Sequence, residues 1–165
     1  MNYIFLDIDG VLNYEQYFHD HVDDEFIIDP EKVKLLSDLV HDTKAKIILS
    51  SSWRYGFDQY LRPIYPDSGC AKLKELFKKY NIKISGRTQV IGDYDGGYRP
   101  DQVKKYIKKH LKPGDHFVIF DDEDWCWADP VGFYIFGDNF IRTEWKSGIT
   151  EKNAKFAEKI LNGEV

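Results

Sequence analysis

Short apolar segments alternate along the chain with segments of helical periodicity, and this alternation constrains the fold more than any other feature. The apolar segments that predict strands are residues 3–8, 45–49, 82–84, 117–120 and 132–136. Apolar side chains three and four positions apart predict helices in the intervals: from residue 30, over 73–80, from residue 100 and over 151–161. This alternation predicts an α/β, Rossmann-like fold, with a central parallel sheet and helices on both faces.

Local signals predict where several of these helices begin and end. Asp29 before Pro30 is a typical helix start, with a capping side chain followed by a proline in the first turn. Pro113 with Gly114 predicts a break before the strand at 117–120, and Thr150 is expected to cap the last helix.

Length and composition predict a single domain over residues 1–165. The chain has 165 residues, of which 42% are hydrophobic, which is enough for one core. Its net charge of −5 argues against a protein that coats nucleic acid, although a local basic groove is compatible with it. Two cysteines are too few for a disulfide scaffold or a cysteine zinc site. Because the chain shows no signal-peptide pattern and no apolar run long enough for a membrane span, we expect a soluble, cytoplasmic protein.

Polar side chains follow three of the predicted strands at the point where each strand ends. Asp7 and Asp9 end the first segment, Ser50 follows the second, and Asp121 with Asp122 follows the strand at 117–120. In open α/β sheets, sites lie beyond the carboxyl ends of the strands, so these side chains are expected to meet at one edge. Each feature alone is typical of a solvated turn or a helix cap, but the ordered combination indicates a site.

Four carboxylates in one crevice repel one another, and burying them without a partner is costly. A divalent cation removes this repulsion, and ligands that are all oxygen favour Mg²⁺ over zinc. Mg²⁺ commonly completes its coordination with water and substrate phosphate. The crevice is therefore interpreted as a magnesium site with room for a phosphoryl group.

The segments that carry these residues resemble the motifs of the haloacid dehalogenase (HAD) superfamily of phosphotransferases. These segments are IFLDIDGVLN at 4–13, KIILSSSWR at 46–54 and FVIFDDEDW at 117–125. The resemblance spans about residues 2–124. More narrowly, the SSSWR stretch, a basic residue before a helix and the compact length resemble small HAD domains of nucleic-acid repair proteins.

The resemblance implies a role for each motif residue in a phosphatase that forms an aspartyl-phosphate. Asp7 is the expected nucleophile, and Asp9 is the expected general acid and base, whose backbone carbonyl can also ligate the metal. Gly10 permits the tight turn and borders the substrate. Ser50 is expected to hydrogen-bond a phosphoryl oxygen, with help from the backbone N–H of Ser51.

The remaining assignments involve cations, metal ligands and aromatic side chains. The expected metal ligands are Asp7, Asp9, Asp121 and Asp122, with Asp121 preferred to Asp122, and Glu123 and Asp124 less favoured. Arg99 is preferred as the third-motif cation, with Lys104 and Arg87 as alternatives. Arg54 is expected to contact substrate phosphate, unless it forms a surface or capping ion pair. Three tryptophans are candidates either for base stacking or for core packing: Trp53, Trp125 and Trp127.

The chain lacks room for a substantial cap domain. Residues 13–29 are about the length of a flap, and residues 53–98 must also supply a helix and a strand of the core. What remains is a loop at 62–69 and a glycine-rich turn at 92–97. An open site favours a bulky substrate, so we expect a Mg²⁺-dependent phosphomonoester hydrolase that acts on a polynucleotide end or a nucleotide. The alternatives are a small-metabolite or sugar phosphatase and a catalytically silent HAD-like binding module.

Overall fold

The computed structural model describes residues 1–22, 27–89 and 98–165. Its strands are β1 (Asn2–Leu6), β2 (Lys46–Leu49), β3 (Ile84–Arg87), β4 (His116–Asp121) and β5 (Phe140–Arg142). Its α-helices are α1 (Glu15–Asp20), α2 (Pro30–Thr43), α3 (Gly69–Lys79), α4 (Arg99–His110) and α5 (Glu151–Leu161). Two short 3₁₀ helices are η1 (Ser52–Gly56) and η2 (Gly137–Asn139). This succession confirms the predicted alternation of strands and helices.

The described strands form one parallel sheet in the order β3-β2-β1-β4-β5. The chain adds β2 and β3 on one side of β1 and then crosses to add β4 and β5 on the other side. This reversal creates a switch point between β1 and β4, where open α/β sheets bind ligands. The register pairs Leu6 with both Leu49 and Phe120, so β1, β2 and β4 end at the same level.

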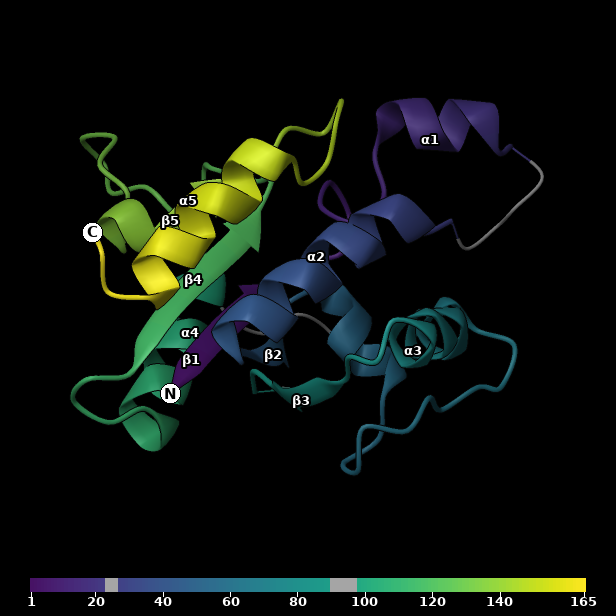
Figure 1. The fold of residues 1–165 in the computed structure, drawn as a ribbon, viewed down its shortest axis with the longest axis horizontal. Helices are drawn as coiled ribbons and strands as arrows, with labels where there is room; N and C mark the ends of the chain where they lie inside the picture. The colour runs from purple at the N-terminus through teal and green to yellow at the C-terminus, as the bar shows by residue number, and fades with distance from the viewer. Residues whose placement is uncertain (23–26, 90–97) are drawn as a thin grey trace.

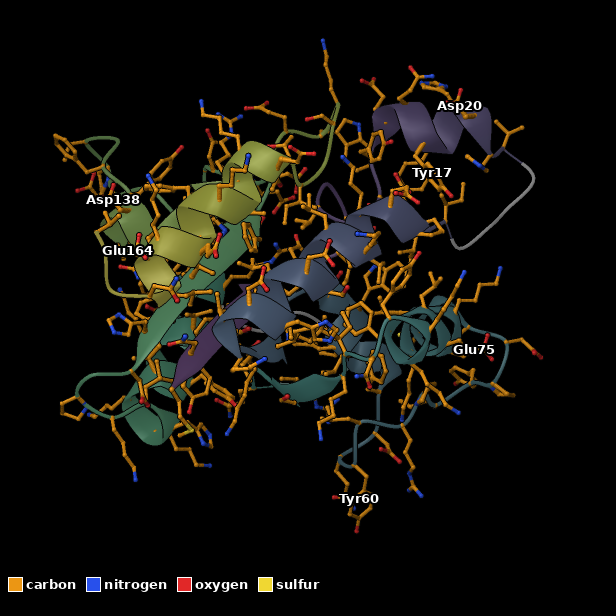
Figure 2. All side chains as sticks on the ribbon, viewed as in Figure 1. Tyr17, Asp20, Tyr60, Glu75, Asp138 and Glu164 are labelled. Carbon is orange, nitrogen blue, oxygen red and sulfur yellow. The ribbon has the colours of Figure 1, made fainter. Side chains whose placement is uncertain are left out.

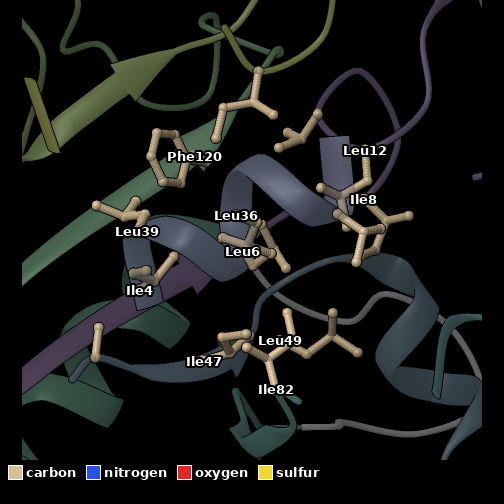
Figure 3. Close-up of a cluster of buried hydrophobic side chains, with 14 of the residues drawn as sticks. Ile4, Leu6, Ile8, Leu12, Leu36, Leu39, Ile47, Leu49, Ile82 and Phe120 are labelled. Carbon is tan, nitrogen blue, oxygen red and sulfur yellow. The ribbon is translucent and has the colours of Figure 1, made fainter. Parts of the chain in front are cut away.

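Helices cover both faces of the sheet, as the predicted fold class requires. Figure 1 shows α2 and α5 side by side across one face, with α4 on the opposite face. On the α2 face, Ile4 and Leu6 of β1 share a buried cluster with Leu36 (Figure 3). On the α4 face, Phe5 belongs to a second cluster with Val103. Because alternate residues of β1 are buried on opposite faces, its apolar run is nearly continuous.

The predicted helix caps are confirmed. The Asp29 side chain accepts a hydrogen bond from the backbone N–H of Glu31, and Pro30 begins α2. Thr150 and Asn153 form a reciprocal capping box at the start of α5. These caps fix the starts of the two helices that cover one face of the sheet.

Two strand predictions were wrong in position. No strand forms over residues 132–136, where Phe133 is 73% exposed; instead, the last strand is β5, in which Phe140 and Ile141 are buried. The aromatic residues of 132–136 have high strand propensity, but tertiary burial selects the later pair. The predicted strand at 82–84 is displaced to β3, Ile84–Arg87, a polar edge strand whose sequence gives only a weak apolar signal.

The structure contains no large cap domain in its described part, as predicted. Helix α1 lies within residues 13–29 and has no buried residue, and Figure 1 shows it standing away from the sheet. Residues 53–89 supply most of η1 and all of α3 and β3. The glycine-rich turn at 92–97 lies outside the described residues. Within the described ranges, no helix has the length and apolar character that a membrane span requires.

Candidate active site

The site lies where β1, β2 and β4 end side by side. Asp7 follows β1, Ser50 follows β2 and Asp121 ends β4. Ladder-like hydrogen bonds continue past the strands: the N–H of Asp7 donates to the Phe120 carbonyl (3.0 Å), and that of Ser50 donates to the Leu6 carbonyl (2.9 Å). The three side chains therefore meet at one edge of the sheet, as predicted from the sequence.

Three carboxylates converge at the switch point. Asp7 and Asp121 are buried and Asp122 is half-buried, and one oxygen of each lies within 4.8 Å of the others. The donors of this group are oxygen atoms alone, which suits a hard cation such as Mg²⁺. These residues therefore fit a magnesium ion, with Asp121 and Asp122 placed as expected.

Arg99 supplies the positive charge that faces this acidic group. It begins α4, and its Nη1 donates to Asp7 Oδ2 (3.0 Å) and to Asp121 Oδ2 (2.6 Å). Its Nη2 lies 3.8 Å from a carboxylate oxygen of Glu123. Burial alone would lower the pKa of Arg99, but Asp7 and Asp121 outweigh burial and raise it. One guanidinium therefore balances only part of the negative charge.

The acids of the fourth motif differ from ordinary aspartates. Burial, and then the charge of Asp7, raise the pKa of Asp121 to about 7, although Arg99 opposes the rise. The same two causes raise the pKa of Asp122 to about 6. Raised carboxylate pKa values are typical of clustered acids at functional sites.

The other candidates for the third-motif cation lie elsewhere. Arg87 donates from Nη1 to the carbonyls of Arg54 (2.7 Å) and Phe57 (2.6 Å). Lys104 has an exposed side chain 3.7 Å from Asp101. Of the three candidates, the structure therefore brings only Arg99 to Asp7.

Asp9 has a separate environment from the three clustered acids. Its Oδ1 accepts a hydrogen bond from Asn13 Nδ2 (2.8 Å), and its Oδ2 accepts one from Trp53 Nε1 (3.0 Å). Both carboxylate oxygens are therefore held by neutral N–H donors. The Asp9 side chain does not join the three clustered acids, and ligation through its backbone carbonyl stays a prediction.

Both the backbone conformation at position 10 and the nearby side chain of Asp122 require a glycine there. Its φ is +71°, and a Cβ at this position would lie 2.2 Å from Cγ of Asp122. The Gly10 N–H donates to Asn13 Oδ1 (3.0 Å), and its carbonyl accepts from Thr143 Oγ1 (2.8 Å). The absence of a side chain at Gly10 thus allows Asp122 to approach the end of β1. Its contact with substrate stays a prediction.

The serines after β2 are buried beside Asp7. The Oγ of Ser50 has no hydrogen-bond partner within the described residues, which fits an acceptor or donor that substrate would engage. Ser51 caps η1 through its side chain, which accepts from the backbone N–H of Trp53 (3.2 Å). The N–H of Ser51 donates to the Leu6 carbonyl (3.3 Å), so in this arrangement it does not point freely into the site.

Arg54 supports the serine loop from within the protein. It is 0% exposed, and its Nη1 donates to the carbonyls of Ser50 (3.0 Å) and Ser51 (2.8 Å). Its Nη2 donates to Gln102 Oε1 of α4 (2.9 Å). The expected contact of Arg54 with substrate phosphate stays a prediction, and the alternative of a surface ion pair is wrong because the side chain is buried.

The three tryptophans have different surroundings. Trp127 is fully buried and stacks on Phe140, with 5.3 Å between ring centroids, which confirms core packing for this residue. Trp53 is half-buried against Asp9, whereas Trp125 is 73% exposed on the segment that follows the clustered acids. The prediction that all three tryptophans form a wall for base stacking is therefore wrong for Trp127.

Two supporting residues were missed by the sequence analysis. Asn13 closes the turn after β1 through Asp9 and Gly10, and its only signal is its place at the end of the first motif. Thr143 follows β5, where its N–H donates to the Asp121 carbonyl (3.0 Å) and its hydroxyl donates to that of Gly10. Nothing in the local sequence indicates that Thr143 joins the first and fourth motifs.

The fold and the site together define the class of this domain. A parallel sheet with paired aspartates after β1, a serine after β2, and two acids at the end of β4 beside an arginine of α4 defines a HAD-type domain. A family model described as "HAD domain in Swiss Army Knife RNA repair proteins" matches residues 3–154, and the chain therefore belongs to this family. The resemblance stated from the sequence is confirmed. Comparisons with curated proteins and with solved structures returned no match.

Proposed function

We propose that this protein is a Mg²⁺-dependent phosphomonoester hydrolase that acts through an aspartyl-phosphate intermediate. The observation that carries the proposal is the convergence of Asp7, Asp121 and Asp122, of which Asp7 and Asp121 contact Arg99. Membership of the HAD superfamily supports phosphatase chemistry at this position.

Asp7 is the nucleophile in this proposal. A carboxylate oxygen of Asp7 attacks phosphorus in line with the ester oxygen, so that an acyl-phosphate bond forms as the ester bond breaks. Attack by an anion on an anion is opposed by repulsion, which Arg99 reduces because it contacts Asp7 directly. When bound, Mg²⁺ would be held by Asp7, Asp121 and Asp122 and would neutralise charge on the transferring phosphoryl group.

Asp9 moves the proton that the reaction requires. It protonates the departing ester oxygen, and then takes a proton from the water that cleaves the acyl-phosphate, which regenerates Asp7 and releases phosphate. The hydrogen bonds from Trp53 and Asn13 support this role because they fix the orientation of the Asp9 carboxylate.

Ser50 is proposed to hold a phosphoryl oxygen. Its buried hydroxyl lies next to Asp7 in the register of the sheet, and Arg54 fixes the loop that carries it. Removing one such donor from an active site typically lowers kcat by about 10²–10³-fold.

The proposed substrate is the phosphorylated end of a nucleic acid or a nucleotide. The family description refers to RNA repair proteins, and a site without a large cap domain accommodates a bulky substrate. A small-metabolite phosphatase and a silent binding module remain the competing functions that an assay must separate.

Turnover of a generic aryl phosphate tests the proposed reaction. We expect hydrolysis that requires Mg²⁺ and that falls by at least about 10⁴-fold in Asp7→Asn. This variant should stay folded, because it removes one of three mutually repelling charges. Asp38→Asn is the matched control, since Asp38 lies exposed on α2 and pairs with Lys34. Full activity in Asp7→Asn would remove Asp7 as the nucleophile, and no turnover by the wild type would favour the silent module.

A substrate panel tests the proposed substrate class. We expect a 3′-phosphorylated oligonucleotide or a mononucleotide to have a higher kcat/KM than a hexose phosphate. Preference for the hexose phosphate would favour the small-metabolite alternative.

A further inference from the structure

Strand β3 forms one edge of the sheet, and a basic pocket lies on each side of it. The first pocket has a volume of about 750 Å³ and lies between α3 and the beginnings of β2 and β3. We call it the α3-side pocket. Its cationic lining residues are Lys46, Lys74, Lys78 and Lys83, and its described lining contains no aspartate or glutamate.

The second pocket has a volume of about 340 Å³ and lies between β3 and α4. We call it the α4-side pocket. Its basic lining residues are Arg87, Lys105, Lys109 and His110, and no acid contributes to its described lining. Edge strand β3 is therefore flanked by positive charge on both faces.

This distribution contrasts with the composition of the chain, whose 28 acids outnumber its 23 lysines and arginines. Elsewhere on the surface, some basic side chains pair with acids, as Arg142 does with Asp124 (2.9 Å), whereas Lys32 and Lys44 donate to backbone carbonyls. At the pockets, Lys74 Nζ donates to the Leu61 carbonyl (3.0 Å), and Arg87 donates to two backbone carbonyls. Burial lowers the pKa of Arg87, and the charge of Asp58 opposes this shift. Such lysines and arginines keep a positive field that attracts a polyanion.

An exposed aromatic side chain stands at the mouth of the α3-side pocket. Tyr60 is 68% exposed, and Figure 2 shows it at the tip of a loop that extends away from the body of the domain. The loop is held by Asp58, which accepts from the backbone N–H groups of Tyr60 and Arg62. The Arg62 guanidinium lies 5.0 Å from the centre of the Tyr60 ring and pairs with Asp58 at 2.8 Å. An exposed ring beside a basic pocket is typical of surfaces that stack unpaired bases.

The α4-side pocket adjoins the candidate active site. Gln102 lines this pocket, and its side chain accepts from Arg54, which in turn donates to the Ser50 carbonyl. A chain of two hydrogen bonds therefore connects the pocket wall to the serine loop. A strand bound along the β3 edge would lead toward the ends of β2 and β1.

We propose that the two pockets beside β3, with Tyr60, form a binding surface for single-stranded nucleic acid. The role of this surface rests on the proposed function, because the surface would bind the strand whose phosphorylated end enters the active site. Positive charge accounts for binding of the phosphates, and Tyr60 accounts for selection of a strand with unpaired bases rather than an acidic polypeptide.

Binding of a labelled single-stranded RNA oligonucleotide without a terminal phosphate tests this surface independently of catalysis. Fluorescence anisotropy at several salt concentrations gives both Kd and its salt dependence. We expect Lys74→Gln/Lys78→Gln and Lys105→Gln/Lys109→Gln each to weaken binding roughly tenfold or more. Each pair should also reduce the slope of log Kd against log salt by about 1.4, which corresponds to two lost phosphate contacts.

Lys152→Gln/Lys155→Gln on α5 is the matched control. It removes the same charge from a helix that lies against β4 rather than β3, and we expect wild-type binding. Tyr60→Ala should weaken binding by roughly fivefold or more without changing the salt slope, because stacking involves no ion release.

Three results would overturn the proposal. These are equal affinities of the wild type and both pocket variants, an equal loss in the α5 control, and competition by poly-glutamate as strong as that by RNA. The last result would assign the surface to an acidic protein partner. If the wild-type protein binds RNA but does not hydrolyse aryl phosphate, only the proposed function is contradicted. Failure of the binding surface and failure of the proposed function are therefore distinguishable.

Discussion

The two aspartates of the first motif lie two residues apart but are held by different physical means. Asp7 is buried next to Asp121 and Asp122, and its charge is opposed by like charges and balanced in part by Arg99. Asp9 meets no such cluster, and its carboxylate accepts hydrogen bonds from two neutral groups, of Trp53 and Asn13. The three clustered acids therefore carry more negative charge than Arg99 balances, whereas both carboxylate oxygens of Asp9 already have hydrogen-bond donors.

Under the proposed function, this difference separates two tasks within one site. A group of acids with too little positive charge has a high affinity for a cation and for the phosphate that accompanies it. A carboxylate with two fixed neutral donors keeps one orientation whether or not ligand is bound, which suits a residue that must transfer a proton at a defined place. Predictions that disturb one side and spare the other test whether the division holds.

Removal of Arg99 should have the largest effect. Arg99→Gln leaves Asp7 and Asp121 buried without their cation, and loss of one partner of a buried ion pair costs about 3–5 kcal/mol. Thermal unfolding without metal should therefore show a large fall in Tm, of which saturating Mg²⁺ restores a part. Lys104→Gln on the same helix is the control, and its exposed ion pair should contribute less than about 1 kcal/mol. Equal Tm values for the two variants would contradict the charge balance described here.

The metal-free protein should lose stability as the pH rises. The pKa values of Asp121 and Asp122 are raised to about 7 and about 6. The folded state therefore keeps protons that the unfolded state has released, and stability falls wherever the folded state binds more protons. This contribution is fully present below the ordinary aspartate value of 3.8 and is lost as the pH rises through about 6 and 7.

We expect the Tm of the metal-free protein to fall by several degrees between about pH 5 and about pH 8. Saturating Mg²⁺ should remove most of this fall, because the cation favours the ionised carboxylates. Calorimetric scans across this range give the answer directly. A Tm that rises with pH in the absence of metal would show that the acids are not held in a repelling cluster.

Gly10→Ala should disturb the acid side through a steric contact. Alanine at a φ of +71° costs about 1–2 kcal/mol, and its Cβ would also displace Asp122. We expect a loss of stability of about 2 kcal/mol together with weaker Mg²⁺ binding, measured by titration calorimetry. Gly114→Ala separates the two causes, since Gly114 has a φ of +87° but no neighbour within 4 Å of an added Cβ. If both variants bind Mg²⁺ equally, Asp122 is not part of the metal group.

The central part of the fold could be predicted from the sequence because its signals are local. β1 and β4 are apolar runs followed directly by acids, and parallel strands bring such ends together. β3 and β5 were misplaced because an edge strand such as Ile84–Arg87 carries polar residues, whereas the aromatic segment 132–136 has strand propensity without burial. Edge strands are decided by contacts that the local sequence does not contain.

The candidate site divides in the same way. The clustered residues belong to motifs with a local signal: Asp7 and Asp121 stand at strand ends and Arg99 begins α4, so the sequence already singled out all three. The supporting contacts join segments far apart in the chain: Thr143 bonds to Gly10, and Trp53 bonds to Asp9. No local pattern predicts such pairs, because each depends on where the folded chain returns. Arg54 illustrates the same limit, since burial and not residue type decides that it supports the serine loop.

The smallest effect is expected on the neutral side of the site. Trp53→Phe keeps an aromatic ring in place but removes the Nε1–H that donates to Asp9 Oδ2. One such hydrogen bond contributes about 1.4 kcal/mol, so kcat should fall roughly tenfold. KM should stay near its wild-type value because the clustered acids lose no contact, and Tm should fall only slightly because phenylalanine keeps most of the packing of Trp53 against the core. Trp125→Phe is the control, since Trp125 is exposed and is not recorded as a partner of Asp9. A fall in Mg²⁺ affinity in Trp53→Phe, with kcat unchanged, would mean that Asp9 belongs with the metal-binding acids, and the two sides of the site would then act as one.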